Sequence, residues 1–152
     1  MITIRLIHAL CLWSVSQGSL EYKSPSAQKR YWHKYAHTAH RTCQEVARRG
    51  YVQKLNVLEL ISVSYVESRH TKKLKSLQGA RGPLQAMPKY WSRKDDKDYI
   101  TAGLRAWKYY REHSTSLSEA AGKYNGGGSK SRYAQDVQAH YDGLSKLYNV
   151  LR

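Results

Sequence analysis

The sequence predicts a mainly α-helical protein that forms one compact domain with functional loops between its helices. Apolar residues recur at helical spacing along most of the chain, helix-capping pairs precede several of these stretches, and no segment alternates as a strand would. With 152 residues, 41% of them hydrophobic, the chain is long enough for one core and too short for two large ones.

Residues 1–24 form an apolar N-terminal segment, and their sequence has two possible interpretations. Arg5 followed by the apolar stretch 6–15 has the order of a weak secretory signal, and the alternative is an apolar helix. No stretch approaches the roughly 20 apolar residues that a membrane-spanning helix needs. Cys11 and Cys43 lack metal-binding spacing, and a disulfide between them is one option for an exported protein.

Ser24 followed by Pro25 predicts the start of a long helix, which runs to about residue 49 and ends at Gly50. Its apolar residues occupy one face at helical spacing. The opposite face is predicted to be a solvated basic stripe, made of Lys29, Arg30, Lys34, Arg41, Arg48 and Arg49.

Asn56 and Glu59 have the form of an N-terminal cap for a second helix, whose apolar residues Val57, Leu58, Leu60, Ile61, Val63, Tyr65 and Val66 lie on nearly every side. A helix that is apolar on almost every side is predicted to lie buried in the centre of the domain. Residues 68–87 lose this periodicity and include Gly79, Gly82 and Pro83, so they predict a structured loop.

Further helices are predicted over about residues 100–111, 117–124 and 133–148. Ser116 and Glu119 form a capping box for the middle one. Three carboxylates precede the first of these helices, close to its positive end: Asp95, Asp96 and Asp98.

The net charge of +15 predicts attraction to a polyanion. Nucleic acid, an acidic membrane surface and a bacterial envelope rich in carboxylates and phosphates all meet this description. Charge alone does not choose between them.

Glu67 is the first candidate for chemistry, because it stands at the C-terminal end of the buried apolar helix. Burial and the negative end of the helix both disfavour the charged carboxylate, so both raise its pKa. A general acid near neutral pH needs such a raised pKa. The alternative is a surface glutamate where the helix emerges into solvent.

Four motifs in this order resemble the soluble lytic transglycosylases and the related goose-type lysozymes. Glu67-Ser68 is similar to the family's Glu-Ser motif at the end of its central helix, and residues 79–88 are similar to its GAxGLMQ segment with a trailing Met-Pro. Residues 123–127 resemble the Ala-Tyr-Asn motif, and residues 133–137 fit the final Tyr-x-x-x-Val signature. The resemblance covers about residues 55–148 and departs from the family at Pro83, Leu84 and Lys123.

The resemblance implies that residues 25–152 are a lysozyme-like helical catalytic domain that cleaves peptidoglycan between N-acetylmuramic acid and N-acetylglucosamine. Glu67 would protonate the glycosidic oxygen. Tyr124 would place its hydroxyl close to the Glu67 carboxylate or to the charge that develops in the substrate. The other residues that the resemblance implies for the substrate site are Ser76, Gln85, Met87, Asn125 and Tyr133.

The number of carboxylates indicates the type of reaction. Glycosidases usually flank the bond with two, but no Asp or Glu occurs between Glu67 and Asp95. One carboxylate favours a mechanism in which the sugar's own C6 hydroxyl closes on C1 and gives a 1,6-anhydro product. Asp95, Asp96 or Asp98 would allow hydrolysis by water if their connection folded back. Neither route needs a metal or cofactor.

Peptidoglycan glycan strands and the anionic envelope surface are therefore the expected partners of a monomer that acts at the bacterial cell wall or periplasm. Phage lysis or cell-wall penetration, a conjugation or secretion system, and general wall turnover all remain open. The alternatives from other classes are a basic nucleic-acid-binding protein, which the charge suits, and a structural component of a phage particle or secretion machine.

Overall fold

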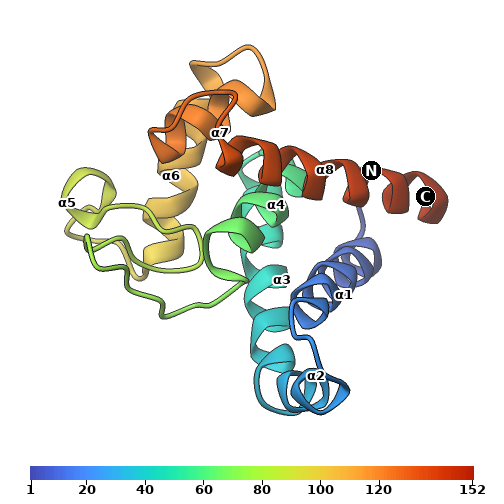
Figure 1. Ribbon diagram of the computed structural model, residues 1–152. Helices are drawn as coiled ribbons and strands as arrows, with labels where there is room; N and C mark the ends of the chain where they lie inside the picture. The colour runs from blue at the N-terminus through green and yellow to red at the C-terminus, as the bar shows by residue number, and fades with distance from the viewer.

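Each stretch with helical periodicity forms a helix in the computed structural model, which describes residues 1–152 (Figure 1). The domain is all-α and has seven helices, counted with α2–η1–α3 as one continuous helix, and no strand. In chain order the elements are α1 (Ile4–Leu20), α2 (Pro25–Tyr31), the π-helical turn η1 (Trp32–Ala36), α3 (His37–Val52), α4 (Val57–Ser68), α5 (Pro88–Trp91), α6 (Tyr99–Glu112), α7 (Leu117–Asn125) and α8 (Arg132–Leu151).

The predicted helix starts are confirmed at three caps. The side chain of Ser24 accepts a hydrogen bond from the backbone of Ala27, that of Asn56 from Glu59, and that of Ser116 from Glu119. Such bonds satisfy backbone N–H groups that have no partner within the helix. These local signals therefore set the beginnings of α2, α4 and α7.

The end predicted at Gly50 is wrong, because α3 continues to Val52. Gly50 serves instead for close packing. A Cβ atom at this position would lie 2.0 Å from Cδ1 of Leu60 on α4, so the missing side chain lets α3 and α4 approach each other. The helix from Pro25 is also interrupted by the π-helical turn, which the sequence pattern did not indicate.

The predicted burial of α4 is confirmed. α4 lies in the middle of the molecule and packs against α1, α3 and α8 (Figure 1). Its neighbouring residues Leu60 and Ile61 are both fully buried but belong to different apolar clusters, one with α6, α7 and α8 and the other with α1 and α3. α4 therefore joins two halves of the core.

Cys11 of α1 and Cys43 of α3 form a disulfide, with an S–S distance of 2.13 Å. Ile7, Leu10 and Val15 of α1 are buried as well. The N-terminal apolar segment is thus a helix that packs within the same core as the rest of the domain. No helix combines the length and apolar character that crossing a membrane would require.

A buried polar network, which the sequence did not indicate, joins α1, α4 and α8. The hydroxyl of Ser14 lies 2.7 Å from Nε2 of His70 and 2.8 Å from Nε2 of His140, and Nδ1 of His70 lies 2.8 Å from the Ser64 hydroxyl. The ring of Tyr65 stacks on that of His140 at 4.0 Å. Burial lowers the pKa of each histidine to about 3.

Replacing Cys11 and Cys43 by alanine is expected to lower the free energy of unfolding by about 2 to 4 kcal/mol. The cross-link joins residues 32 positions apart and so restricts the unfolded chain. Urea denaturation without reductant measures the difference. Wild-type protein with reductant is the matched control, and equal midpoints for all three samples would contradict the expectation.

Acid is expected to destabilise the fold through His70 and His140. The unfolded chain protonates these imidazoles below about pH 6.5, whereas the folded protein keeps them neutral down to about pH 3. Their effect is absent above pH 6.5 and grows as the pH falls towards 3, by at most about 1.4 kcal/mol per pH unit for each histidine.

Urea denaturation over this pH range measures the effect. His140→Gln is expected to show a shallower loss of stability than wild type, and the exposed His33→Gln is the matched control. The same pH dependence in His140→Gln and wild type would mean that the buried histidines do not cause the acid sensitivity.

Candidate active site

Glu67 lies in the last turn of α4, where it is half-buried. Burial raises the pKa of its carboxyl from 4.5 to about 7, although a hydrogen bond from Tyr133 opposes part of this shift. The negative end of the helix acts in the same direction as burial. The carboxyl group therefore holds its proton for much of the time near neutral pH.

The other acid on α4 is in a different state. Glu59 is buried in the first turn and forms an ion pair with Arg111, at 2.9 Å. Glu67 has no cation within salt-bridge distance, so only the hydrogen bond from Tyr133 compensates for the loss of water around its charged form. Only Glu67 combines burial with an unpaired carboxyl.

Tyr133 is the side chain that contacts Glu67 directly. It stands in the first turn of α8, which Ser131 caps, and its hydroxyl donates a hydrogen bond of 3.0 Å to Oε2 of Glu67. Burial and the nearby Glu67 raise the pKa of Tyr133 well above its usual value. Tyr133 thus remains a hydrogen-bond donor over the whole physiological range.

Tyr124 lies near Glu67 but does not bond to it. Its hydroxyl donates to the backbone carbonyl of Leu84, and its ring packs edge-on against Trp107 and Tyr110. Burial and then the charge of Glu67 raise its pKa well above the usual value, which places the two groups within electrostatic reach. The resemblance implies that the Tyr124 hydroxyl lies close to the Glu67 carboxylate or to the charge that develops in the substrate, and the side chain that bonds to the carboxyl is Tyr133.

Ser76 and Gln85 both take part in holding the loop between α4 and α5 together. The Ser76 hydroxyl accepts a hydrogen bond from the backbone of Ala80. Nε2 of Gln85 donates to the carbonyl oxygens of Leu74 and Gly82, at 3.0 and 2.8 Å. This loop has only isolated β-bridges, so many of its backbone N–H and C=O groups need side chains as hydrogen-bond partners. Contact of Ser76 and Gln85 with a substrate stays a prediction.

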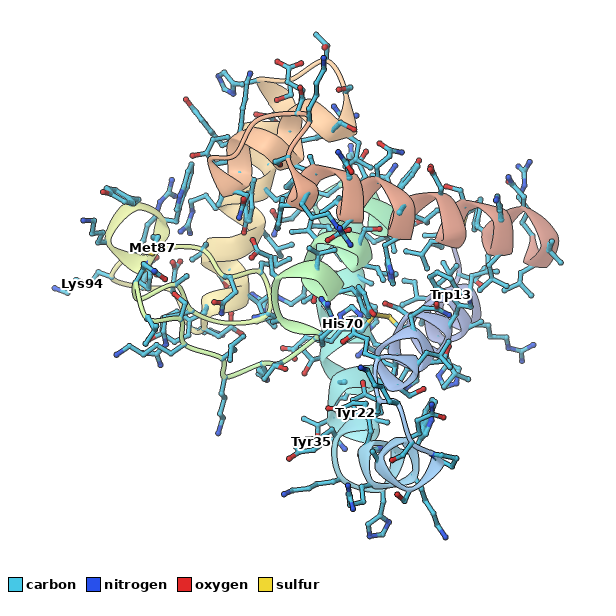
Figure 2. All side chains as sticks on the ribbon, viewed as in Figure 1. Trp13, Tyr22, Tyr35, His70, Met87 and Lys94 are labelled. Carbon is cyan, nitrogen blue, oxygen red and sulfur yellow. A yellow bond between two sulfur atoms is a disulfide. The ribbon has the colours of Figure 1, made fainter.

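Met87 and Asn125 lie at the edges of the site. Met87 is half-buried just before α5, and Figure 2 shows it on the part of the loop that is remote from His70. Asn125 is exposed at the end of α7, where Gly126 adopts the left-handed backbone conformation that ends the helix. Neither side chain makes a hydrogen bond with Glu67 or Tyr133, and their contact with a substrate also stays a prediction.

The carboxylates in the connection before α6 are held by arginines. Asp96 lies 2.8 Å from Arg105, which is the main reason that its pKa falls to about 2. Asp98 caps α6 and pairs with Arg49 at 2.7 Å. Asp95 is exposed. Asp96 and Asp98 therefore have structural partners of their own.

A cleft of about 440 Å³ lies between α1, α4 and α8. Its lining includes Val66 and Arg132, the residues directly before Glu67 and Tyr133, but neither Glu67 nor Tyr133 itself. Trp13 of α1 adds an aromatic ring to this lining.

Comparison with protein-family models, with curated proteins and with solved structures gives no match. No three His, Cys, Asp or Glu side chains converge as a metal ion would need. The candidate site is therefore defined by its geometry: a buried carboxyl at the end of α4, one tyrosine that bonds to it and a second tyrosine close by.

Tyr133→Phe is expected to raise the pKa of Glu67 further, because it removes a hydrogen bond that stabilises the charged carboxylate. Carbon-13 NMR titration of the Glu67 side-chain carboxyl measures the change. Tyr141→Phe is a matched control on the same helix, since the Tyr141 hydroxyl makes no hydrogen bond to the carboxyl. A pKa that stays unchanged or falls in Tyr133→Phe would show that this bond does not act on Glu67.

Proposed function

We propose that the protein is a peptidoglycan lytic transglycosylase with a lysozyme-like helical domain and Glu67 as its single general acid and base. The observation that carries the proposal is the half-buried Glu67, whose carboxyl pairs with no cation and whose pKa is raised by burial to about 7. The motifs around Glu67, Gln85, Tyr124 and Tyr133 support the same activity.

In the first step Glu67 donates its proton to the glycosidic oxygen between N-acetylmuramic acid and N-acetylglucosamine. The bond between C1 and this oxygen breaks, and the N-acetylglucosamine end leaves as an alcohol. The N-acetyl group of the muramic acid stabilises the positive charge that develops at C1. Tyr133, which bonds to Oε2 of Glu67, steadies the carboxyl during this transfer.

In the second step Glu67, now a carboxylate, takes the proton of the C6 hydroxyl. The C6 oxygen bonds to C1 and gives a 1,6-anhydro ring, so no water is consumed and Glu67 regains its proton. A second carboxylate to activate water is the usual requirement of the hydrolytic alternative. Arg105 and Arg49 hold Asp96 and Asp98, so two of the three candidates for this second carboxylate already have partners, which supports the transglycosylase reaction.

The disulfide supports action at the cell wall or periplasm, because such bonds persist mainly in oxidising compartments. The basic stripe on α2, η1 and α3 supports attraction to the anionic envelope. Its exposed cations are Lys29, Arg30, Lys34, Arg41 and Arg48, whereas Arg49 pairs with Asp98. The stripe would also suit nucleic acid, but a nucleic-acid-binding function would give no role to Glu67.

Glu67→Gln is expected to reduce the clearing of a cell-wall suspension by about 100-fold or more, because amide nitrogen cannot supply the proton. Wild-type activity is expected to fall as the pH rises through about 7, where Glu67 loses its proton. Turbidity over time measures both effects.

Glu112→Gln is the matched control, because Glu112 is an exposed acid that forms no salt bridge. It is expected to clear the suspension at the wild-type rate. Equal clearing by wild type and Glu67→Gln, or no clearing by either, would rule out the proposed role of Glu67.

A further inference from the structure

A second cleft, of about 550 Å³, lies between the corner that joins α1 to α2, the π-helical turn, and the start of the loop after α4. None of the family-like motifs accounts for its N-terminal part. Its lining combines aromatic rings, hydroxyl groups and a few charges, from Gly18, Glu21, Tyr22, Tyr31, Tyr35, Thr38, Ala39, Ser68, Arg69, His70, Thr71, Lys72, Lys73 and Leu74.

Three tyrosine rings form one side of this cleft. Tyr22 and Tyr35 are 41% and 51% exposed, and both flank the ring of Tyr31, with centroids 5.4 and 6.3 Å from it. Figure 2 shows Tyr22 and Tyr35 next to each other below His70. Exposed aromatic faces within a concave surface are a common feature of ligand sites.

The π-helical turn helps to form the cleft. Tyr35 belongs to this turn and is half exposed, whereas the next residue, Ala36, is buried in the core. A π-helical turn is rare and is found often at functional sites, because it changes the direction of side chains on a helix that otherwise continues. The π-helical turn therefore coincides with the exposed ring of Tyr35.

Tyr31 carries a polar group that the protein leaves without a partner. The residue is only 7% exposed, and its hydroxyl makes no hydrogen bond within the chain. A Cβ atom at Gly18 would lie 3.0 Å from this oxygen, closer than an ordinary contact, so the glycine lets the Tyr31 hydroxyl pack against α1. Because Tyr31 lines the cleft, its hydroxyl can bond with an occupant in place of water.

The charges of the cleft are largely compensated. Arg69 pairs with Glu21 at 2.7 Å, and Lys72 pairs with Glu45 at 3.2 Å, which leaves Lys73 as the unpaired cation of the lining. A polyanion needs several free cations. Aromatic faces with free hydroxyls and little net charge suit a sugar ring, whose C–H face stacks on the rings while its hydroxyls form hydrogen bonds.

We propose that this cleft is a saccharide-binding subsite that holds a pyranose ring of an N-acetylated glycan strand. Ser68 and Arg69 line it and directly follow Glu67, so the subsite would hold a neighbouring part of the same strand. This assignment rests on the proposed function, because it names a second region of contact with the same substrate.

Binding of soluble N-acetylglucosamine oligomers to the Glu67→Gln protein tests the proposal by isothermal titration calorimetry. Adding Tyr35→Ala is expected to weaken the affinity by about 10-fold, because a stacking surface is lost. Adding Tyr31→Phe removes only the hydroxyl and is expected to weaken it by about 3-fold. Tyr51→Ala is the matched control, because Tyr51 is 44% exposed on the same continuous helix and lies outside the cleft.

Amide NMR spectra of the Glu67→Gln protein with the oligomer locate the binding. Shifts in residues 18–39 and 68–74 are expected. Absence of binding, equal affinity of the Tyr35→Ala and Tyr51→Ala proteins, or shifts confined to the surroundings of residues 67 and 133 would each overturn the subsite.

These outcomes are separate from those for the proposed function. Cell-wall clearing that depends on Glu67 would stand even if the subsite were overturned. Conversely, binding in the cleft without any clearing would keep the saccharide subsite and remove the proposed activity.

Discussion

The covering of α4 on all sides is the constraint on which the rest of the structure depends. A helix that is apolar on nearly every side is stable in water only when other helices surround it. α1, α3 and α8 provide this cover, and the disulfide and the missing side chain of Gly50 hold α1 and α4 close to α3. Because Glu67 stands at the end of this helix, the same packing withdraws its carboxyl from water.

The chemistry of the site follows from the way the ends of three helices meet around that carboxyl. Tyr133 from the start of α8 bonds to Glu67, and Tyr124 from the end of α7 lies within electrostatic reach. Tyr124 also binds the carbonyl of Leu84, a fully buried residue of the loop. The loop, α7 and α8 are thus fixed relative to the carboxyl, which limits the rearrangement needed for proton transfer.

The sequence predicts what depends on neighbouring residues and misses what depends on distant ones. The caps at Ser24, Asn56 and Ser116 and the apolar character of α4 are local, and they were sufficient to place the helices and Glu67. The contact between Tyr133 and Glu67, and the network of His70 and His140, join segments far apart in the chain. No spacing within one helix indicates such contacts, and the motifs named both Tyr124 and Tyr133 for the site without indicating which of them bonds to Glu67.

The mass of the glycan fragments that the wild-type protein releases from purified peptidoglycan tests the central claim most directly. A single carboxyl that takes the proton of the C6 hydroxyl yields fragments that end in 1,6-anhydro-muramic acid. Each of these fragments is lighter by one water molecule than the hydrolytic product. Fragments with ordinary reducing ends would show that water attacks C1 and that a second group activates it. The absence of any released fragment would contradict a catalytic role for Glu67 altogether.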